Sequence, residues 1–510
     1  MNIVFTTQTA GLNVFYHLIQ KMRQTLHIDR IGCYIAYSMY YERFLKRHPE
    51  IETDYTIVKE WENVKLALNV KPNLRTIAKY EACYGNPTLW DAIICDRKIY
   101  QGKRVTERQD YRPSFTHNEM LSMIQVSIEK LEALLNRIEP DIILSFDPIT
   151  FGDYLLYLIA KSKKIPMLFF RTTKIENYIS LDEGVSGCSP HISNFYREYE
   201  DRHQSDVWTE KAIAYLQKIE DRDIRYEGMI PIPKRKKKYL FSSEYSLIKG
   251  LKSELEYRRK YKGDHKNSDI FIPFLYKNVI SPLNSKKIDY SLSKHYVTLD
   301  HCRQWDFAFY PLQSEPEISL LIWGKSYMNQ IEAIRNIARS LPVGMKLVVK
   351  EHPRAIGYRK LGYYEKILEI PNVSLIYPYE EVRNIIKRAK IVVAISTFVA
   401  FEAVIYKKPA IMLGGPRPFT ILPNSMIRYV NSPNDLACEI DDLLKTYEFQ
   451  EKSLIHYIAA TMKGSVAIDL FTTLLKKKGR YGDADADSFD EEIDKMSKYT
   501  IHRIREFVGS

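Results

Sequence analysis

The sequence predicts an α/β protein in which two doubly wound domains face each other across a cleft and a basic helical insertion separates them. Runs rich in β-branched and aromatic residues alternate with amphipathic helical patterns near both ends of the chain, which is typical of doubly wound sheets. The middle of the chain is charged and breaks this alternation. A length of 510 residues leaves room for two or three domains. We therefore expect domains at residues 1–230 and 301–475, the insertion at 231–300, and a charged tail with a helix at 476–510.

The N-terminal half contains two predicted strand–helix alternations. In the first, an amphipathic helix over Asn13–Leu26 lies between strands at Asn2–Thr6 and Ile31–Ala36. The second comprises, in order, the helix Leu121–Ile138, the strand Ile142–Phe146, the helix Phe151–Ser162 and the strand Ile165–Phe170.

The C-terminal half shows the same alternation more regularly. Strands are predicted at Phe307–Pro311, Met345–Lys350, Val373–Tyr377, Ile391–Ile395 and Pro409–Leu413. Helices are predicted at Tyr327–Ser340, Lys360–Glu369, Glu380–Arg388, Phe398–Tyr406 and Asn434–Thr446. Strands joined by single helices require right-handed parallel crossovers. Two such Rossmann-like domains form the arrangement called GT-B, whose ligands would bind at the carboxyl ends of the strands, in the cleft.

The net charge is +12, from 75 Lys and Arg against 63 Asp and Glu, and much of the excess lies in a basic stretch over residues 234–262. This stretch is either a solvated linker or a surface that docks on an anionic inner membrane. Anionic small substrates are a further class of partner that the charge permits. A nucleic-acid partner is not expected, because the sequence contains no zinc finger, RNP-type aromatic motif or helix-turn-helix signal.

Compartment and metal content are predicted from what the sequence lacks. No apolar run approaches the ~20 residues of a membrane-spanning helix, and the first residues do not resemble a secretory signal. The six cysteines form no C-x-x-C pair, which favours a reduced, cytoplasmic protein without a zinc site. The acidic run over residues 483–494 resembles a calcium loop, but Ser488 replaces the required glycine, so a solvated linker is the preferred interpretation. We expect neither a metal nor a cofactor.

Polar residues follow two predicted strands in positions that suit an anion. Lys350 and His352 end one strand, so the imidazole and a cation would lie at the rim of the cleft. Ser396 and Thr397 follow another strand and precede a helix. Either they cap this helix, or their hydroxyls form an anion site together with the free N–H groups at its start. Glu402 lies one to two turns into that helix and could reach a ribose.

Two further segments of the C-terminal half are candidates for nucleotide-sugar binding. Gln313 and Glu317 lie in a polar, proline-constrained segment after the first strand, and Gly324 follows before the next helix. The Gly414–Arg417 segment follows the strand that ends at Leu413, and its glycines allow a ligand to approach the backbone closely.

Carboxylates of the N-terminal half are candidates for a general base. Asp182 and Glu183 precede Gly184 on a predicted loop, where either carboxylate could deprotonate an acceptor hydroxyl. An ordinary turn explains the same residues equally well. Asp147 is a second carboxylate at the predicted rim of the cleft.

Several segments resemble the bacterial capsule polysaccharide biosynthesis family: FYPLQSEPE (309–317), LPVGMKLVVKEHPR (341–354), PNVSLI (371–376) and ISTFVAFEAVIYKKPAIMLGG (395–415). More distantly, the acid-acid-Gly and His-Pro elements resemble those of GT-B sialyltransferases, polysialyltransferases and Kdo transferases. The resemblance implies that His352 binds the donor phosphate and that Ser396 and Thr397 also contact phosphate. It also implies that Glu183 is the acceptor base.

These features predict a metal-independent glycosyltransferase that extends a surface glycan or glycolipid. The resemblance of the His-Pro element implies that the donor is a CMP-sugar such as sialic acid or Kdo, with a UDP-sugar as the second choice. His352 and the helix terminus would stabilise charge on the leaving phosphate, and Glu183 or Asp182 would take the acceptor proton. Two alternatives stay open: a nucleotide-sugar epimerase or hydrolase of the same fold, and a non-catalytic capsule assembly protein docked on the membrane.

Overall fold

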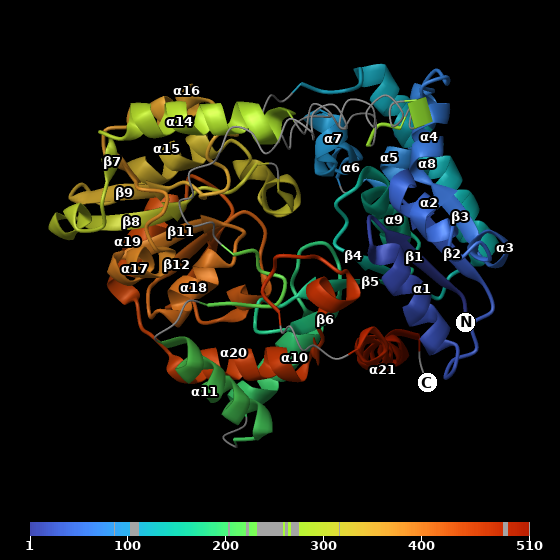
Figure 1. Cartoon of the computed structure of the whole chain (residues 1–510). Coiled ribbons are helices and arrows are strands. Elements are labelled where there is room, and N and C mark those ends of the chain that lie inside the picture. Colours follow the sequence, from blue (N-terminus) through green and yellow to red (C-terminus); the bar gives the residue numbers. More distant parts are fainter. Residues whose placement is uncertain are drawn as a thin grey trace.

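The computed structural model describes residues 1–85, 87–102, 112–201, 205–220, 224–231, 259–260, 264–266, 275–315, 317–482 and 488–508. Two α/β lobes lie side by side, the N-terminal one blue to teal and the C-terminal one yellow to orange (Figure 1). The predicted basic stretch lies outside the described residues except for 259–260, and so does the acidic run at 483–487. Among the described residues, no helix combines the length and the apolar character needed to cross a bilayer.

The N-terminal lobe is built on a seven-stranded sheet with the order β14-β6-β5-β4-β1-β2-β3. The strands are β1 (Ile3–Thr7), β2 (Ile31–Ile35), β3 (Thr56–Lys59), β4 (Ile142–Phe146), β5 (Met167–Thr172), β6 (Tyr178–Glu183) and β14 (Val466–Ala467). Strands β5 to β3 are parallel, whereas β6 is antiparallel to β5. Strand β1 is buried on both faces, with Ile3 and Phe5 in one core and Val4 in the other.

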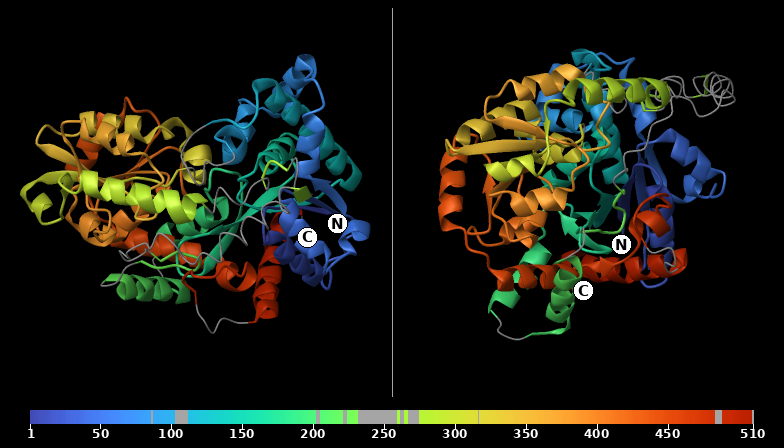
Figure 2. Two further views of the ribbon diagram at one scale, coloured as in Figure 1. Left: turned by 45° about the horizontal axis from the view of Figure 1, so that its top comes forward. Right: turned by 60° about the vertical axis from the view of Figure 1, so that its left-hand side comes forward.

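Helices cover both faces of this sheet. They are α1 (Gly11–Met22), α2 (Ser38–Leu45), α3 (Ile51–Asp54), α4 (Glu60–Ala67), α5 (Leu74–Tyr84), α6 (Trp90–Cys95), α7 (Arg97–Tyr100), α8 (His117–Ile138), α9 (Phe151–Ser162) and α21 (Phe489–Val508). The long helix α8 starts with a capping box in which Thr116 and Glu119 bond each other's backbone N–H groups. Helix α21 returns the chain to the first lobe and packs on α1, so both termini lie in that lobe (Figure 2).

The C-terminal lobe has a parallel seven-stranded sheet with the order β13-β12-β11-β8-β9-β10-β7. Its strands are β7 (Tyr296–Val297), β8 (Asp306–Pro311), β9 (Met345–Lys350), β10 (Val373–Ile376), β11 (Ile391–Ile395), β12 (Ala410–Leu413) and β13 (Ile427–Val430). Phe307 and Phe309 face one core, and Ala308 and Tyr310 face the other. Because both faces are buried, these strands read as continuous apolar runs.

The helices of the C-terminal lobe come from three parts of the chain, at residues 190–220, 281–292 and 330–463. They are α10 (Pro190–Asp201), α11 (Val207–Glu220), α14 (Ser281–Leu292), α15 (Gln330–Ser340), α16 (Leu361–Leu368), α17 (Val382–Arg388), α18 (Val399–Ile405), α19 (Leu436–Thr446) and α20 (Glu451–Lys463). Short turns of other helix types in this lobe are η1 (Tyr276–Ile280), η2 (His301–Gln304), η3 (Ser319–Trp323), η4 (Lys325–Tyr327) and η5 (Pro418–Ile421). The turn η6 (Leu470–Leu474) packs into the N-terminal lobe. Helices α10, α11 and α20 pack together below the sheet (Figure 1).

The predicted fold class is confirmed, because each lobe is an α/β domain built on a largely parallel sheet. The predicted loop at 181–184 is wrong in part: residues up to Glu183 form β6, because Ile179 and Leu181 alternate with Ser180 and Asp182 and pair with β5.

The structure also differs from the predicted domain limits. Helices α10 and α11, expected in the first domain, pack into the core of the C-terminal lobe. Strand β7, expected in the insertion, is the edge strand of the C-terminal sheet, and β14 returns to the N-terminal sheet by pairing with β6.

Candidate functional site

Four loops meet at the carboxyl edge of the C-terminal sheet. Leu312 N donates to Lys350 O at 2.8 Å, which ties the loop after β8 to the last residue of β9. Gln313 Nε2 donates to Ile395 O at 2.6 Å, at the end of β11. Ser396 Oγ lies 3.2 Å from Gly415 O, in the loop after β12. The structure therefore brings together the four polar segments singled out in the sequence.

His352 is held as a neutral imidazole with one defined tautomer. Its Nδ1 accepts a hydrogen bond from Arg354 N at 3.2 Å, so the ring proton is carried by Nε2. Burial, together with the positive charges of Lys350 and Arg354, lowers the pKa of His352 to about 4. At neutral pH the side chain is thus an uncharged N–H donor, and it adds no positive charge to the site.

Acid should weaken the fold through His352. The unfolded chain takes up this proton near pH 6.5 and the folded chain only near pH 4, so stability decreases as the pH falls through that window. A shift of this size corresponds to roughly 3 kcal/mol when fully developed. We expect the Tm of the wild type to fall more steeply between pH 7 and pH 4.5 than the Tm of H352Q. Parallel Tm curves would show that His352 is not buried in its neutral form.

Lys350 and Gln313 are turned toward the protein itself. Lys350 Nζ donates to Pro378 O at 2.7 Å, and burial lowers the pKa of this lysine to about 8. Gln313 Oε1 accepts a hydrogen bond from Ser319 Oγ at 2.7 Å, while its Nε2 holds Ile395 O. These contacts position the loops around His352. That either side chain also contacts a nucleotide stays a prediction.

The loop after β11 contains a hydroxyl that no described residue satisfies. Helix α18 begins at Val399, and neither Ser396 nor Thr397 caps it, so the capping alternative is wrong. Ser396 has a φ of 41° and its hydroxyl bonds the backbone of the loop after β12. Thr397 Oγ1 is buried and has no hydrogen-bond partner within the described ranges. Glu402, in the first turn of α18, lies near Tyr226.

His352 and Thr397 are separated by one strand. They follow β9 and β11, and β8 lies between these two strands in the sheet. Two strand spacings amount to ~10 Å. This separation suits contacts to different parts of one nucleotide-sized ligand.

Gly324 lets two loops pack backbone against backbone. A Cβ atom on Gly324 would lie 2.4 Å from Ile395 Cγ2, and one on Gly414 would lie 2.7 Å from the Gly324 Cα. The close approach allows Trp323 O to accept a hydrogen bond from Gly415 N. Gly324 thus has a packing role here, and its contact with a nucleotide stays a prediction.

The two lobes touch beside these loops. Trp323 Nε1 donates to Val185 O at 2.5 Å, and the Arg417 guanidinium lies 3.6 Å over the Trp323 ring. A Cβ atom on Gly187 would lie 2.4 Å from Arg417 Nη1, so this arginine of the C-terminal lobe packs on the N-terminal lobe.

Four basic side chains from both lobes form what we call the interlobe cation cluster: Arg171, Lys174, Arg417 and Arg480. Arg171 Nε donates to Asp147 Oδ1 at 2.5 Å. Arg171 Nη1 and Nη2 and Arg417 Nη1 are buried and lack a hydrogen-bond partner among the residues described. Burial, opposed by Asp147 and reinforced by Arg171, lowers the pKa of Arg417 to about 10. Burial and the nearby Arg417 lower the pKa of Lys174 to about 8.

Sequence reasoning did not place three members of this cluster in a site: Arg171, Lys174 and Arg480. A signal was present: Arg171 lies in β5 one residue before its carboxyl end, and Lys174 follows two residues after that end. Glu317 approaches the cluster from the C-terminal lobe. Burial raises the pKa of the Glu317 carboxyl, and Lys174 counteracts this shift.

The candidate carboxylates lie in three different surroundings. Asp182 is buried and accepts a hydrogen bond from Ser189 Oγ. Glu183 pairs in register with Leu168, near the amino end of β5, whereas Asp147 lies at the carboxyl edge beside Arg171. Burial raises the pKa of Glu183, and Arg503 partly offsets this effect. The structure therefore does not bring Glu183 and Asp147 to the same edge of the sheet.

Residues 261–419 match the family model described as capsule polysaccharide biosynthesis protein. This match confirms the resemblance carried by the motifs of the C-terminal half. The matched segment includes His352, Thr397 and Arg417, and thus the loops at the carboxyl edge of the C-terminal sheet. A search of curated proteins finds no match.

Solved structures similar to this chain include a Kdo transferase and a UDP-GlcNAc 2-epimerase. KpsC of Thermosulfurimonas dismutans, described as a beta Kdo 2,7 transferase, is 11% identical, with 73% of this chain and 89% of that chain covered and a TM-score of 0.35. MnaA of S. aureus, solved with UDP, is 13% identical, with 100% and 97% covered and a TM-score of 0.27. UDP-GlcNAc 2-epimerase from Neisseria meningitidis is 12% identical, with 90% and 97% covered and a TM-score of 0.23.

Proposed function

We propose that the protein is a glycosyltransferase that takes a sugar from a nucleotide-activated donor and works in the synthesis of a capsule-type polysaccharide. The observation that carries this proposal is the set of buried guanidinium N–H groups of Arg171 and Arg417 without partners in the described parts of the chain. Leaving a buried donor unpaired costs about 1–3 kcal/mol. Phosphate oxygens are acceptors that match a guanidinium fork. The family match over residues 261–419 supports the assignment to capsule synthesis.

In the proposed reaction, the bond between the sugar and the donor phosphate breaks while an acceptor hydroxyl bonds to the same sugar carbon. Negative charge grows on the leaving phosphate, and the interlobe cation cluster stabilises it. His352 contributes an uncharged Nε2–H donor, and Thr397 contributes a hydroxyl that has no partner among the described residues. No step in this scheme uses a metal ion, since the residues themselves supply the positive charge.

The acceptor proton goes to a carboxylate of the N-terminal lobe. Glu183 is the base that the family resemblance names, and its raised pKa suits a general base. Asp147 is the second candidate, because it lies in the cation cluster. E183Q and D147N distinguish the two: the variant that lacks the base should lose kcat and retain its affinity for the nucleotide.

A nucleotide screen tests the donor class. We expect CMP or CMP-sugars to raise the Tm most, followed by UDP and UDP-sugars. A ligand at 100 times its Kd stabilises the folded chain by ~2.7 kcal/mol. The matched control is AMP, which offers the same phosphate with a different base. A chain that binds no nucleotide would overturn the proposal and favour a non-catalytic assembly protein.

Product analysis separates transfer from epimerisation or hydrolysis. A transferase needs both donor and glycan acceptor, whereas an epimerase or hydrolase of the same fold converts the donor alone.

We include docking on an anionic inner membrane through residues 234–262 in this proposal, because that stretch is strongly basic.

A further inference from the structure

A short segment of the insertion is buried in the N-terminal lobe. Asp264, His265 and Lys266 are 6%, 3% and 4% exposed, respectively. Their partners lie on three different elements of that lobe. Asp264 Oδ2 accepts a hydrogen bond from Ser38 Oγ, and Lys98 Nζ donates to Lys266 O at 2.6 Å. We call residues 264–266 the buried insertion segment.

The Lys266 ammonium occupies a cage of two carboxylates and an aromatic ring. Its Nζ is in ion-pair contact with Glu60 Oε1, 3.2 Å from Asp96 Oδ2 and 4.9 Å from the centre of the Tyr37 ring. All four side chains come from loops or helix starts at the carboxyl edge of the N-terminal sheet or from the insertion. The ammonium is therefore the counter-ion of both carboxylates.

The same carboxylates also bind the start of helix α9. Asp96 Oδ2 accepts from Phe151 N at 3.2 Å, and Glu60 Oε2 accepts from Gly152 N at 3.2 Å. Two negative charges at a helix N-terminus are favourable, but their burial requires a cation as well. Lys266 supplies this cation from a distant part of the sequence.

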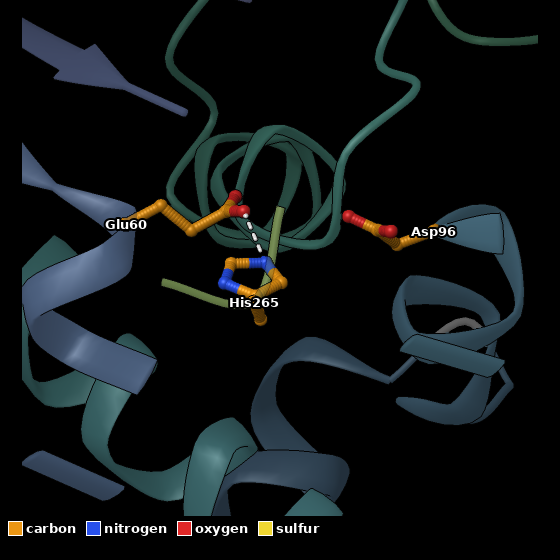
Figure 3. A group of neighbouring side chains, drawn as sticks. All are labelled: Glu60, Asp96 and His265. Carbon is orange, nitrogen blue, oxygen red and sulfur yellow. Dashed lines mark ion pairs between the residues drawn. The ribbon is translucent and has the colours of Figure 1, made fainter. Parts of the chain in front are cut away.

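The cage resembles a metal site, and the position of Lys266 decides against that interpretation. Glu60, Asp96 and His265 each offer one ligand atom, and these atoms lie within 4.8 Å of one another (Figure 3). His265 Nε2 is 3.2 Å from Glu60 Oε1. However, Lys266 Nζ contacts both carboxylates, so an ammonium already stands where a metal ion would bind. Burial alone would raise the pKa of Glu60, but Lys266 and His265 bring it down to about 2.

The cage is joined to the contact between the lobes. Asp96 immediately follows α6, and in α6 Asp91 accepts from Lys325 Nζ of the C-terminal lobe at 2.7 Å. Helix α6 also packs on η3, which carries Trp323 of the interlobe contact. A change at Lys266 would therefore act on the element that meets the other lobe.

We propose that Lys266 is the resident cation of the Glu60–Asp96–His265 cage, in place of a metal ion, and that this ion pair locks the buried insertion segment onto the N-terminal lobe beside the interlobe contact. The lock goes beyond the proposed transferase function and does not depend on it.

The test compares K266M with K287M, a matched change at an exposed lysine of α14. We expect K266M to lower the Tm of the full chain by roughly 5 °C or more, since removing one partner leaves uncompensated buried charge. K287M should leave the Tm unchanged. Adding E60Q to K266M should recover part of the loss, because it removes one of the two stranded charges. If K266M does not fold, the Tm of K287M is compared instead with the Tm of the K266M/E60Q double variant and of K266R, which keeps the positive charge.

Metal addition and hydrogen exchange give the second readout. Without the ammonium, the three ligands are free, so Zn²⁺ or Mn²⁺ should raise the Tm of K266M and leave that of the wild type unchanged. Amide exchange should increase at residues 264–266 and 96–100 in K266M only. The proposal is overturned if the wild type carries one equivalent of metal whose removal by EDTA lowers the Tm, or if K266M is as stable and as protected as K287M.

Discussion

The R417A variant is expected to lose about 10²–10³-fold in kcat/KM for the nucleotide-sugar donor. Arg417 carries a buried Nη1 with no hydrogen-bond partner in the described residues, and it faces Asp147 and Arg171 across the contact between the lobes. A donor phosphate bound there would gain charge during the reaction, so the guanidinium contributes more to the transition state than to the bound substrate. Steady-state kinetics with donor and acceptor measure the loss.

Two further arginine variants test whether the loss of kcat/KM depends on the position of Arg417 and on the planar shape of its guanidinium. R339A removes an exposed arginine of the same lobe and should leave kcat/KM unchanged. R417K keeps a positive charge but lacks the planar fork, so its activity should lie between those of the wild type and R417A. Because Arg417 also packs on Trp323, the Tm of each variant is measured alongside. Activity of R417A equal to that of R339A would remove the cation cluster from the mechanism.

The largest loss of stability is expected for R359M, at about 3–5 kcal/mol. Arg359 is completely buried and binds Glu351, Gln313 O and, at 3.5 Å, Glu315 Oε1. Methionine fills a similar volume but leaves the Glu351 carboxylate, which is only 2% exposed, without its cation. Chemical denaturation of R359M and of the wild type gives the change in the free energy of unfolding.

The consequences of R359M should extend to the site. Glu351 Oε1 accepts from His352 N at 2.7 Å, so a displaced Glu351 also displaces His352. We expect nucleotide affinity to fall together with stability. The E351Q substitution, introduced into R359M, should restore part of the stability by removing the unpaired charge. A stable R359M with intact nucleotide binding would show that this ion pair does not organise the loop.

Much of the C-terminal lobe could be predicted from the sequence. Its strands are buried on both faces, so each reads as a short apolar run bounded by polar residues, as at Ile391–Ile395. The predicted helices of this lobe differ from the observed ones mainly at their ends. For example, the helix predicted at Tyr327–Ser340 is observed at Gln330–Ser340. His352 and Thr397 could be singled out because they follow strands directly.

Other features depend on contacts that a linear pattern does not show. Strand β14 is two residues long and exists only through its pairing with β6. The neutral state of His352 depends on its burial beside two cations, whereas an isolated histidine would titrate near pH 6.5. The lock at Lys266 joins residues that are about two hundred positions apart.

The class of the fold, most strands of the C-terminal sheet, and the loops at its carboxyl edge could be inferred from the amino-acid sequence without a structure. These properties follow from apolar periodicity and from the residues that end each strand, which are local. Two features became visible only in three dimensions: Arg171 and Arg417 lie together, and α10, α11 and α21 pack into other lobes than their positions in the chain suggest. The reason is that charge compensation and the burial of a helix face depend on which distant segments are neighbours in space.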